Sequence, residues 1–195
     1  MIGRAYPQIP ARAKVGRGAM VFILAVVVLG KLDDWGVIDL PAGPTFTTRP
    51  AAGPAPSLAA RAEIPRAYLA AYQRAARTCP HLSWAVLAAV GKVESDHGRT
   101  SLPGVHSGAN PAGATGPMQL GIGGRAGPTW QHYGDGTAGH VYQIGPAAQA
   151  AARKLCHDGA RAGDLRAALY AYNPSAAYVA RVLAIARRYQ TGGGR

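Results

Sequence analysis

A continuous apolar run in the middle of the chain does most to limit the folds open to it. Residues 82–93 read Leu-Ser-Trp-Ala-Val-Leu-Ala-Ala-Val-Gly-Lys-Val. A helix with one solvated face would interrupt such a run with polar residues every three or four positions. We therefore expect a helix over residues 82–96 that is buried on most of its surface, with the rest of a domain packed around it.

Glu94 stands at the end of this expected helix and is one of only two glutamates among 195 residues. The helix dipole is unfavourable for a carboxylate at that end, and partial burial also disfavours the charged form. Both effects raise the pKa of a carboxyl group, and proteins make general acids for near-neutral pH in this way. Glu94 is therefore the candidate catalytic residue.

No second carboxylate is an obvious companion for Glu94. Glycosidases are enzymes that use a carboxyl group as a general acid, and they normally need two carboxyl groups. One protonates the leaving oxygen, and the other acts as nucleophile or activates water. Asp96 would project to a different side of the helix, and Glu63 is expected at a helix start. Asp135 lies in a loop and remains a candidate, whereas Asp164 is expected to cap a helix. One acid without a clear partner argues against ordinary two-carboxylate hydrolysis.

The N-terminal segment has the pattern of an exported chain. Residues 1–17 carry four basic side chains and no acid, residues 18–32 are mostly apolar, and three aspartates follow by residue 39. This order predicts a basic cytoplasmic segment followed by a signal peptide or signal-anchor helix. The uncharged core, 18–30, would cover about 20 Å as a helix, short of the roughly 30 Å of a bilayer core. The alternative is a buried helix of a cytosolic protein.

The remaining chain divides into a linker, a domain and a tail. Residues 33–61 contain five prolines and no hydrophobic period, which predicts an extended linker. Residues 62–190 are expected to form one mainly α domain, and 191–195 a flexible tail. Helices are expected over 65–78, 82–96, 145–157, 164–172 and 174–189. Residues 98–144 are predicted to be long Gly-rich loops of functional importance, and no strand pair is expected.

The two cysteines, Cys79 and Cys156, predict one disulfide, because an exported domain with two cysteines most simply pairs them. That bond would tie the end of the first domain helix to the end of the helix after the loops. Two unpaired buried thiols are the alternative. No spacing of cysteine and histidine resembles a zinc site, and no metal or other cofactor is expected.

The net charge of +12 predicts an anionic partner, which could be nucleic acid, a membrane surface or a charged wall polymer. The arginines are dispersed and the export pattern places the domain outside the cytoplasm, so nucleic acid is not expected. We expect an extracytoplasmic protein that is in the cell wall, membrane-anchored or secreted.

Three short blocks occur in order along the chain: Glu94-Ser95, then Gly-Ala-Thr-Gly-Pro-Met-Gln-Leu over 113–120, then Ala171-Tyr172-Asn173. In order and spacing they resemble the signature blocks of the soluble lytic transglycosylase catalytic domain family, over about 62–189. The exported actinobacterial members are most similar. The resemblance implies a mainly helical fold like that of goose-type lysozyme. It also implies cleavage of the β-1,4 bond between N-acetylmuramic acid and N-acetylglucosamine in peptidoglycan, without water.

The resemblance implies a mechanism in which Glu94 acts twice. It would protonate the glycosidic oxygen while the substrate's N-acetyl group stabilises the cationic centre. It would then take the proton of the muramoyl C6 hydroxyl, which closes a 1,6-anhydro ring. Two alternatives stay open: a lysozyme-type muramidase that uses Asp135 to position water, and a non-catalytic wall-binding module.

The resemblance also implies substrate-binding residues. Ser95 would bond near the acid or the sugar acetamido group, Met118 and Gln119 would line the glycan site, and Tyr172 would orient Glu94 beside Asn173. Three of them have a plainer alternative, in which Ser95 satisfies helix-end backbone, Met118 is core and Asn173 ends its helix. The implied partners are peptidoglycan glycan strands, with anionic wall polymers or the membrane surface nearby, and a monomer is expected.

Overall fold

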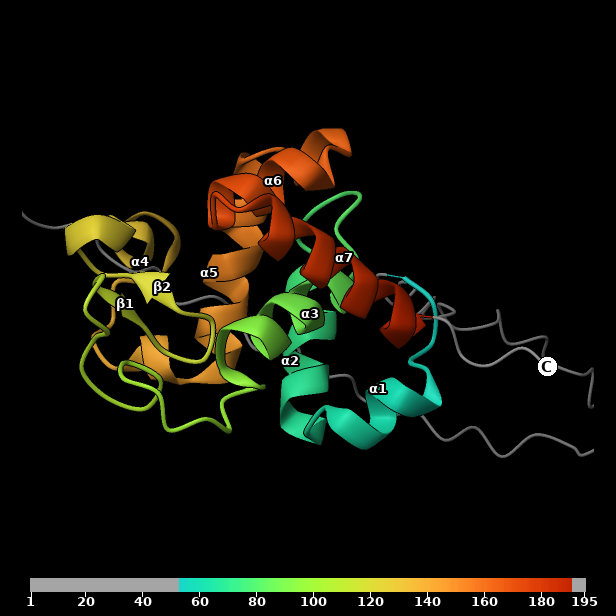
Figure 1. The fold of residues 1–195 in the computed structure, drawn as a ribbon, viewed down its shortest axis with the longest axis horizontal. Coiled ribbons are helices and arrows are strands. Elements are labelled where there is room, and N and C mark those ends of the chain that lie inside the picture. The colour runs from blue at the N-terminus through green and yellow to red at the C-terminus, as the bar shows by residue number, and fades with distance from the viewer. Residues whose placement is uncertain (1–52, 191–195) are drawn as a thin grey trace, which may run out of the picture. The chain divides into compact units, whose positions relative to one another are not determined.

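In the computed structural model, which describes residues 53–190, α3 (Trp84–Ser95) is a central buried helix (Figure 1). Every side chain from Trp84 to Val90 is at most 3% exposed. Helices α2 (Arg66–Ala76) and α7 (Ala176–Gln190) pack against it. The expected buried helix is therefore confirmed.

A second long helix, α5 (Ile144–His157), joins the helical core to the loop region. It packs against α2, α4 (Thr129–Tyr133) and α6 (Leu165–Tyr172). Figure 1 shows the strands and α4 on one side of α5, with α2 and α3 on the other. Three 3-10 helices complete the described elements: η1 (Gly124–Ala126), η2 (His140–Tyr142) and η3 (Ala160–Ala162). The described residues form a mainly helical domain.

All five expected helices are present, with ends within two residues of the expected bounds. Two side-chain caps help to set where they begin. The Ser83 hydroxyl accepts the N–H of Val86 at the start of α3. A carboxylate oxygen of Asp164 accepts the N–H of Ala167 at 2.9 Å, which confirms Asp164 as a helix cap.

A small antiparallel hairpin is present where no strand pair is expected. Strand β1 (Ala114–Thr115) pairs with β2 (Leu120–Gly121), with Ala114 opposite Gly121 and Thr115 opposite Leu120. Strands of two residues are too short to show the alternation by which strands are recognised in a sequence. We call residues 98–143, which contain this hairpin, the hairpin lobe.

The fold begins earlier than the expected boundary at residue 62. Residues 58–61, assigned to the linker, form most of α1 (Leu58–Glu63), which packs against α7. The Ser57 hydroxyl accepts the N–H of Ala60 and donates to the carbonyl of Arg188. The indole N–H of Trp84 donates to the carbonyl of Pro54 at 2.8 Å. These bonds hold the chain against the domain from about residue 54 onward.

Glu63 is the last residue of α1 rather than a residue at a helix start. Its carboxylate pairs with Lys92 of α3 at 2.6 Å and with Arg188 of α7 at 2.5 Å. Lys92 also pairs with Asp96, which in turn binds Arg99. Because these charges are partly exposed, each pair contributes about 1 kcal/mol or less. Together the two ion pairs of Glu63 connect α1 to α3 and to α7.

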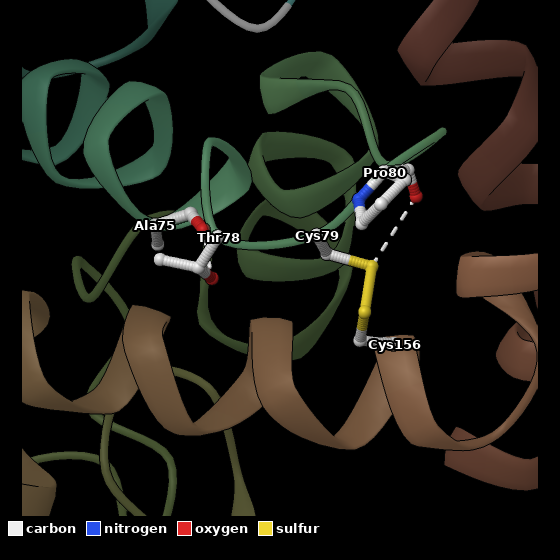
Figure 2. The surroundings of a disulfide bond; sticks show 5 residues. All are labelled: Ala75, Thr78, Cys79, Pro80 and Cys156. Atoms are coloured by element: carbon white, nitrogen blue, oxygen red, sulfur yellow. Dashed lines mark hydrogen bonds between the residues drawn. A yellow bond between two sulfur atoms is a disulfide. The ribbon is translucent and has the colours of Figure 1, made fainter.

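The disulfide between Cys79 and Cys156 is confirmed. Figure 2 shows Cys79 on the turn that follows α2 and Cys156 on α5, with the two sulfur atoms bonded. The bond closes a separation of 77 residues. A crosslink of this span stabilises a fold by roughly 4 kcal/mol in the loop-entropy model. Such bonds are typical of oxidising compartments.

The expected export segment (1–32), most of the linker and the C-terminal tail lie outside the described residues. Within residues 53–190, no helix combines the length and the apolar character that a membrane crossing requires.

Candidate active site

A pocket of about 580 Å³ lies between the hairpin lobe and helices α3, α5 and α6. One wall comes from the hairpin lobe and the other from the helices. The lobe contributes Asn110, Ala112, Ala114, Gln119, Leu120, Gly121, Arg125, Ala126 and Thr129. The helical side contributes Glu94, Lys154, Ala171, Tyr172, Asn173 and Pro174. The pocket therefore brings all three family-like blocks together at one place.

Glu94 lies in the last turn of α3 and faces this pocket. The side chain is half-buried and lines a concave surface. Desolvation raises the pKa of Glu94 to about 7, and a hydrogen bond from Tyr178 opposes the rise. The carboxyl group is therefore protonated in a large fraction of molecules near neutral pH, as a general acid must be.

Tyr178, not Tyr172, donates a hydrogen bond to the acid. The Tyr178 hydroxyl donates to Oε1 of Glu94 at 2.7 Å, whereas Tyr172 donates to the carbonyl of Met118 at 2.7 Å. The implied role of Tyr172 is corrected accordingly, although Tyr172 lines the pocket. The sequence holds no signal for Tyr178, because it sits among Ala and Val in α7, 84 residues from its partner.

Ser95 serves the backbone and does not line the pocket. It is 1% exposed, and its hydroxyl donates to the carbonyl of Pro117 at 2.6 Å. The same oxygen accepts the N–H of Gly98 at 2.8 Å. Ser95 therefore fastens the hairpin lobe to the end of α3, which matches its plainer alternative of satisfying backbone at the helix end.

Met118 is a core residue, fully buried at 0% exposure. Its sulfur lies close to Gly91 of α3, where an added Cβ would also overlap the Tyr72 hydroxyl. A Cβ on Gly121, which lines the pocket, would likewise overlap the carbonyl oxygens of Ala126 and Gly127. The glycine at 121 thus permits close approach of the protein's own backbone.

Gln119 lines the pocket, as expected, and is held by hydrogen bonds on both ends of its amide. Its Nε2 donates to the carbonyl of Gly116, and its Oε1 accepts from Nδ2 of Asn110, both at 2.9 Å. The backbone is left-handed there, with φ of 49°, which is uncommon for a residue other than glycine. The partner amide fixes the orientation of a side chain that could otherwise rotate.

Asn110 is a site residue that the sequence analysis missed. Its Oδ1 accepts the N–H groups of Ala112 and Ala114, so one side chain shapes the turn before β1 and also holds Gln119. The Asn110-Pro111 dipeptide is a turn signal, but it does not indicate a contact nine residues away.

Asn173 and Lys154 complete the helical wall of the pocket. Asn173 is the C-terminal cap of α6, which matches its plainer alternative, and it also borders the cavity. The ammonium group of Lys154 pairs with Asp158 at 2.7 Å and lies 5.9 Å from the centroid of the Tyr172 ring. This position fixes Tyr172 between a cation and the Met118 carbonyl.

Glu94 is the only carboxylate among the described residues that line the pocket. Asp135 borders a different, smaller depression and pairs with His140 at 2.7 Å. Asp96 is held by Arg99 and Lys92, whose hydrogen bonds keep the pKa of Asp96 well below its usual value. Within residues 53–190, no three His, Cys, Asp or Glu side chains gather in a way that could hold a metal ion.

The arrangement can donate one proton and later accept another at the same carboxyl group. Oε1 of Glu94 is occupied by Tyr178, which leaves the other oxygen for a ligand in the pocket. The amide of Gln119 and the side chain of Asn173 are polar groups at the same cavity.

No protein-family model, curated protein or solved structure matches this chain.

Proposed function

We propose that this protein is a peptidoglycan lytic transglycosylase with Glu94 as its catalytic residue. The observation that carries the proposal is a pocket in which one carboxyl group has a pKa of about 7 and in which residues 53–190 place no second carboxylate beside it. The order of the three sequence blocks supports the same assignment, since their residues line or underlie this pocket.

Glu94 protonates the oxygen that joins C1 of N-acetylmuramic acid to the next sugar, and that C1–O bond breaks. The N-acetyl group of the same sugar stabilises the cationic C1. Glu94, now a carboxylate, takes the proton of the C6 hydroxyl while O6 bonds to C1. The products are a 1,6-anhydro sugar and a free hydroxyl on the departing sugar. No water is consumed, and Glu94 ends protonated again.

This chemistry suits a site with one carboxyl group. The attacking hydroxyl belongs to the substrate, so no second carboxylate is needed to activate water, and intramolecular attack benefits from proximity. The hydrolase alternative relied on Asp135, which is exposed, bonded to His140 and absent from the pocket lining. The position of Asp135 therefore gives no support to the hydrolase alternative.

Tyr178 adjusts the acid for its two roles. Its hydrogen bond favours the carboxylate form, which lowers the pKa of Glu94, while burial raises that pKa. The balance near 7 lets one group give up a proton and recover it at a similar pH. The phenol also fixes which carboxyl oxygen faces the substrate.

The net charge of +12 supports a location beside anionic polymers. We propose that the domain acts outside the cytoplasm on glycan strands, as a monomer, close to wall polymers or membrane surface of negative charge. The disulfide is consistent with that compartment.

The test is mass spectrometry of the fragments that wild type, Glu94→Gln and Asp135→Asn release from purified peptidoglycan. Wild type and Asp135→Asn are expected to give 1,6-anhydromuramoyl ends with no oxygen from labelled water, and Glu94→Gln to release nothing. Reducing ends that carry the label would establish a hydrolase instead. Wall binding without release by wild type would leave only a binding module.

A further inference from the structure

Arg125 is a charged group of the pocket that the proposed mechanism does not use. It lies in η1 of the hairpin lobe, is exposed, and lines the same cavity as Glu94. Its guanidinium makes no hydrogen bond or ion pair with any residue between 53 and 190. The other cation of the pocket, Lys154, is in contrast neutralised by Asp158.

Every carboxylate of the described chain is already engaged elsewhere. Glu63, Asp96, Asp135 and Asp158 are in ion pairs, Asp164 caps α6, and Glu94 is bonded to Tyr178. None of them balances the charge of Arg125. When Glu94 is protonated, the pocket therefore carries an uncompensated positive charge, and a concave surface concentrates such a potential.

The turn that carries Arg125 is held firmly to the hairpin. The N–H of Ala126 donates to the carbonyl of Ala112 at 2.7 Å, and the N–H of Gly123 donates to the carbonyl of Gly127 at 3.0 Å. Because η1 also packs on β2, the backbone under Arg125 is fixed relative to Gln119 and the rest of the lobe wall. The side chain of Arg125 therefore starts from a fixed point in the lobe wall of the pocket.

We propose that Arg125 binds a carboxylate group of the glycan strand and makes the site selective for carboxylate-bearing strands over neutral ones. The inference rests on the proposed function. A guanidinium suits this role because its planar N–H groups can bind both oxygens of one carboxylate. In peptidoglycan the carboxylate can come from the lactyl group of the muramoyl sugar or from the attached peptide, and the site chemistry is the same for both.

The experiment measures kcat/KM of the full-length wild type, Arg125→Gln and Arg66→Gln on three strands. The first strand carries its peptides, the second has them removed so that lactyl carboxylates are free, and the third has those carboxylates converted to neutral methylamides. Arg66 is an exposed arginine at the start of α2, outside the pocket, and serves as the matched control.

Arg125→Gln is expected to lower kcat/KM about tenfold on carboxylate-bearing strands, mainly through KM, and to leave the neutral strand unchanged. A loss on the second strand alone identifies the lactyl carboxylate, a loss on the first strand alone identifies the peptide, and losses on both show that Arg125 accepts either carboxylate. Equal losses on all three strands, or no loss on any, would overturn the proposal. Arg66→Gln should behave as wild type.

Binding measurements separate this inference from the proposed function. The same strands are titrated against Glu94→Gln and against Glu94→Gln combined with Arg125→Gln, so no cleavage is needed. Weaker binding of carboxylated strands by the double variant supports the role of Arg125 even if wild type gives no anhydro product. Identical binding by the two variants contradicts it, whatever reaction Glu94 catalyses.

Discussion

The phenol oxygen of Tyr178 lies 2.7 Å from Oε1 of Glu94, so α7 supplies a hydrogen-bond donor to the acid at the end of α3. Burial also raises the pKa of Tyr178 itself, well above its usual value, and the charge of Glu94 raises it further. The phenol therefore stays protonated and remains a donor over the pH range in which Glu94 titrates. Only Glu94 titrates in this pair.

Replacement of Tyr178 by phenylalanine should move the basic limb of the pH–rate profile to higher pH. The lost bond favoured the carboxylate, so the pKa of Glu94 rises further above 7 without it. Activity near neutral pH should also fall, roughly tenfold or more, because the acid is less well oriented. The measurement is kcat/KM on soluble glycan strands across the pH range.

Tyr172→Phe is the matched control for that experiment. Its hydroxyl bonds to the Met118 carbonyl and not to Glu94. Any loss of activity in this variant should come only from a loosened pocket wall, so the basic limb should stay where the wild type has it. A limb that moves equally in both variants would contradict the assignment of Tyr178.

His97 is another group whose pKa the fold changes strongly. It is 1% exposed, with its ring nitrogens 3.2 Å from the Tyr72 hydroxyl and 3.1 Å from the Tyr189 hydroxyl. Burial, with help from the charge of Arg99, lowers the pKa of His97 from 6.5 to about 4. The unfolded chain therefore binds a proton at His97 between pH 4 and 6.5, and the folded chain does not.

Glu94 and His97 should give opposite slopes of stability against pH, which nearly cancel in the wild type. Folded Glu94 keeps its proton up to about pH 7, whereas the unfolded residue loses it near 4.5. Its contribution to the free energy of unfolding thus falls as pH rises, while that of His97 grows. Between pH 5 and 6 each slope is about 1 kcal/mol per pH unit, with opposite sign.

Urea unfolding of Glu94→Gln from pH 5 to 8 tests this balance. With only His97 left to titrate, the free energy of unfolding of this variant should rise by about 1 kcal/mol between pH 5 and 6. At pH 8 its free energy of unfolding should be about 3 kcal/mol larger than that of wild type. His97→Asn should show the reverse slope between pH 5 and 6. Glu63, Asp96 and Asp158 have lowered pKa values and do not titrate in that range. If the stability of Glu94→Gln depended on pH in the same way as that of wild type, the raised pKa of Glu94 would be refuted.

The five longer helices could be predicted because their signals are local, whereas α1 and α4, of six and five residues, were missed. The run before Glu94 is too apolar for a surface helix, and Ser83 and Asp164 cap helices in the ordinary way. The hairpin could not be predicted, because its two-residue strands are held by the side chain of Asn110 and by turns, not by a pattern of alternating residues.

The acid could be found in the sequence, but most of its surroundings could not. Glu94 is distinguished by its rarity and by its place at a helix end. Tyr178 depends on how α7 crosses α3, and no short motif encodes that crossing. Ser95 and Met118 belong to recognisable blocks, yet the structure uses them to support the backbone and the core.

Replacement of both Cys79 and Cys156 by alanine should lower the free energy of unfolding by roughly 4 kcal/mol. The bond links the turn after α2 to the end of α5, and its loss releases the long intervening segment in the unfolded state. Equilibrium unfolding in urea measures the change. Wild type under reducing conditions should show a loss of similar size, and a stability equal to that of the oxidised protein would contradict the expected contribution.

Two substitutions of Asn110 should differ in their effects on stability and on activity. Asn110→Asp keeps the oxygen that accepts the N–H groups of Ala112 and Ala114, but it loses the donor that holds Gln119. This variant should remain within about 1 kcal/mol of wild type in urea unfolding while its kcat/KM falls. Asn110→Ala also leaves two backbone donors without their acceptor, which should cost a further 1–3 kcal/mol, as an order-of-magnitude value. If Asn110→Asp retains full activity, the amide pair with Gln119 has no part in binding the glycan.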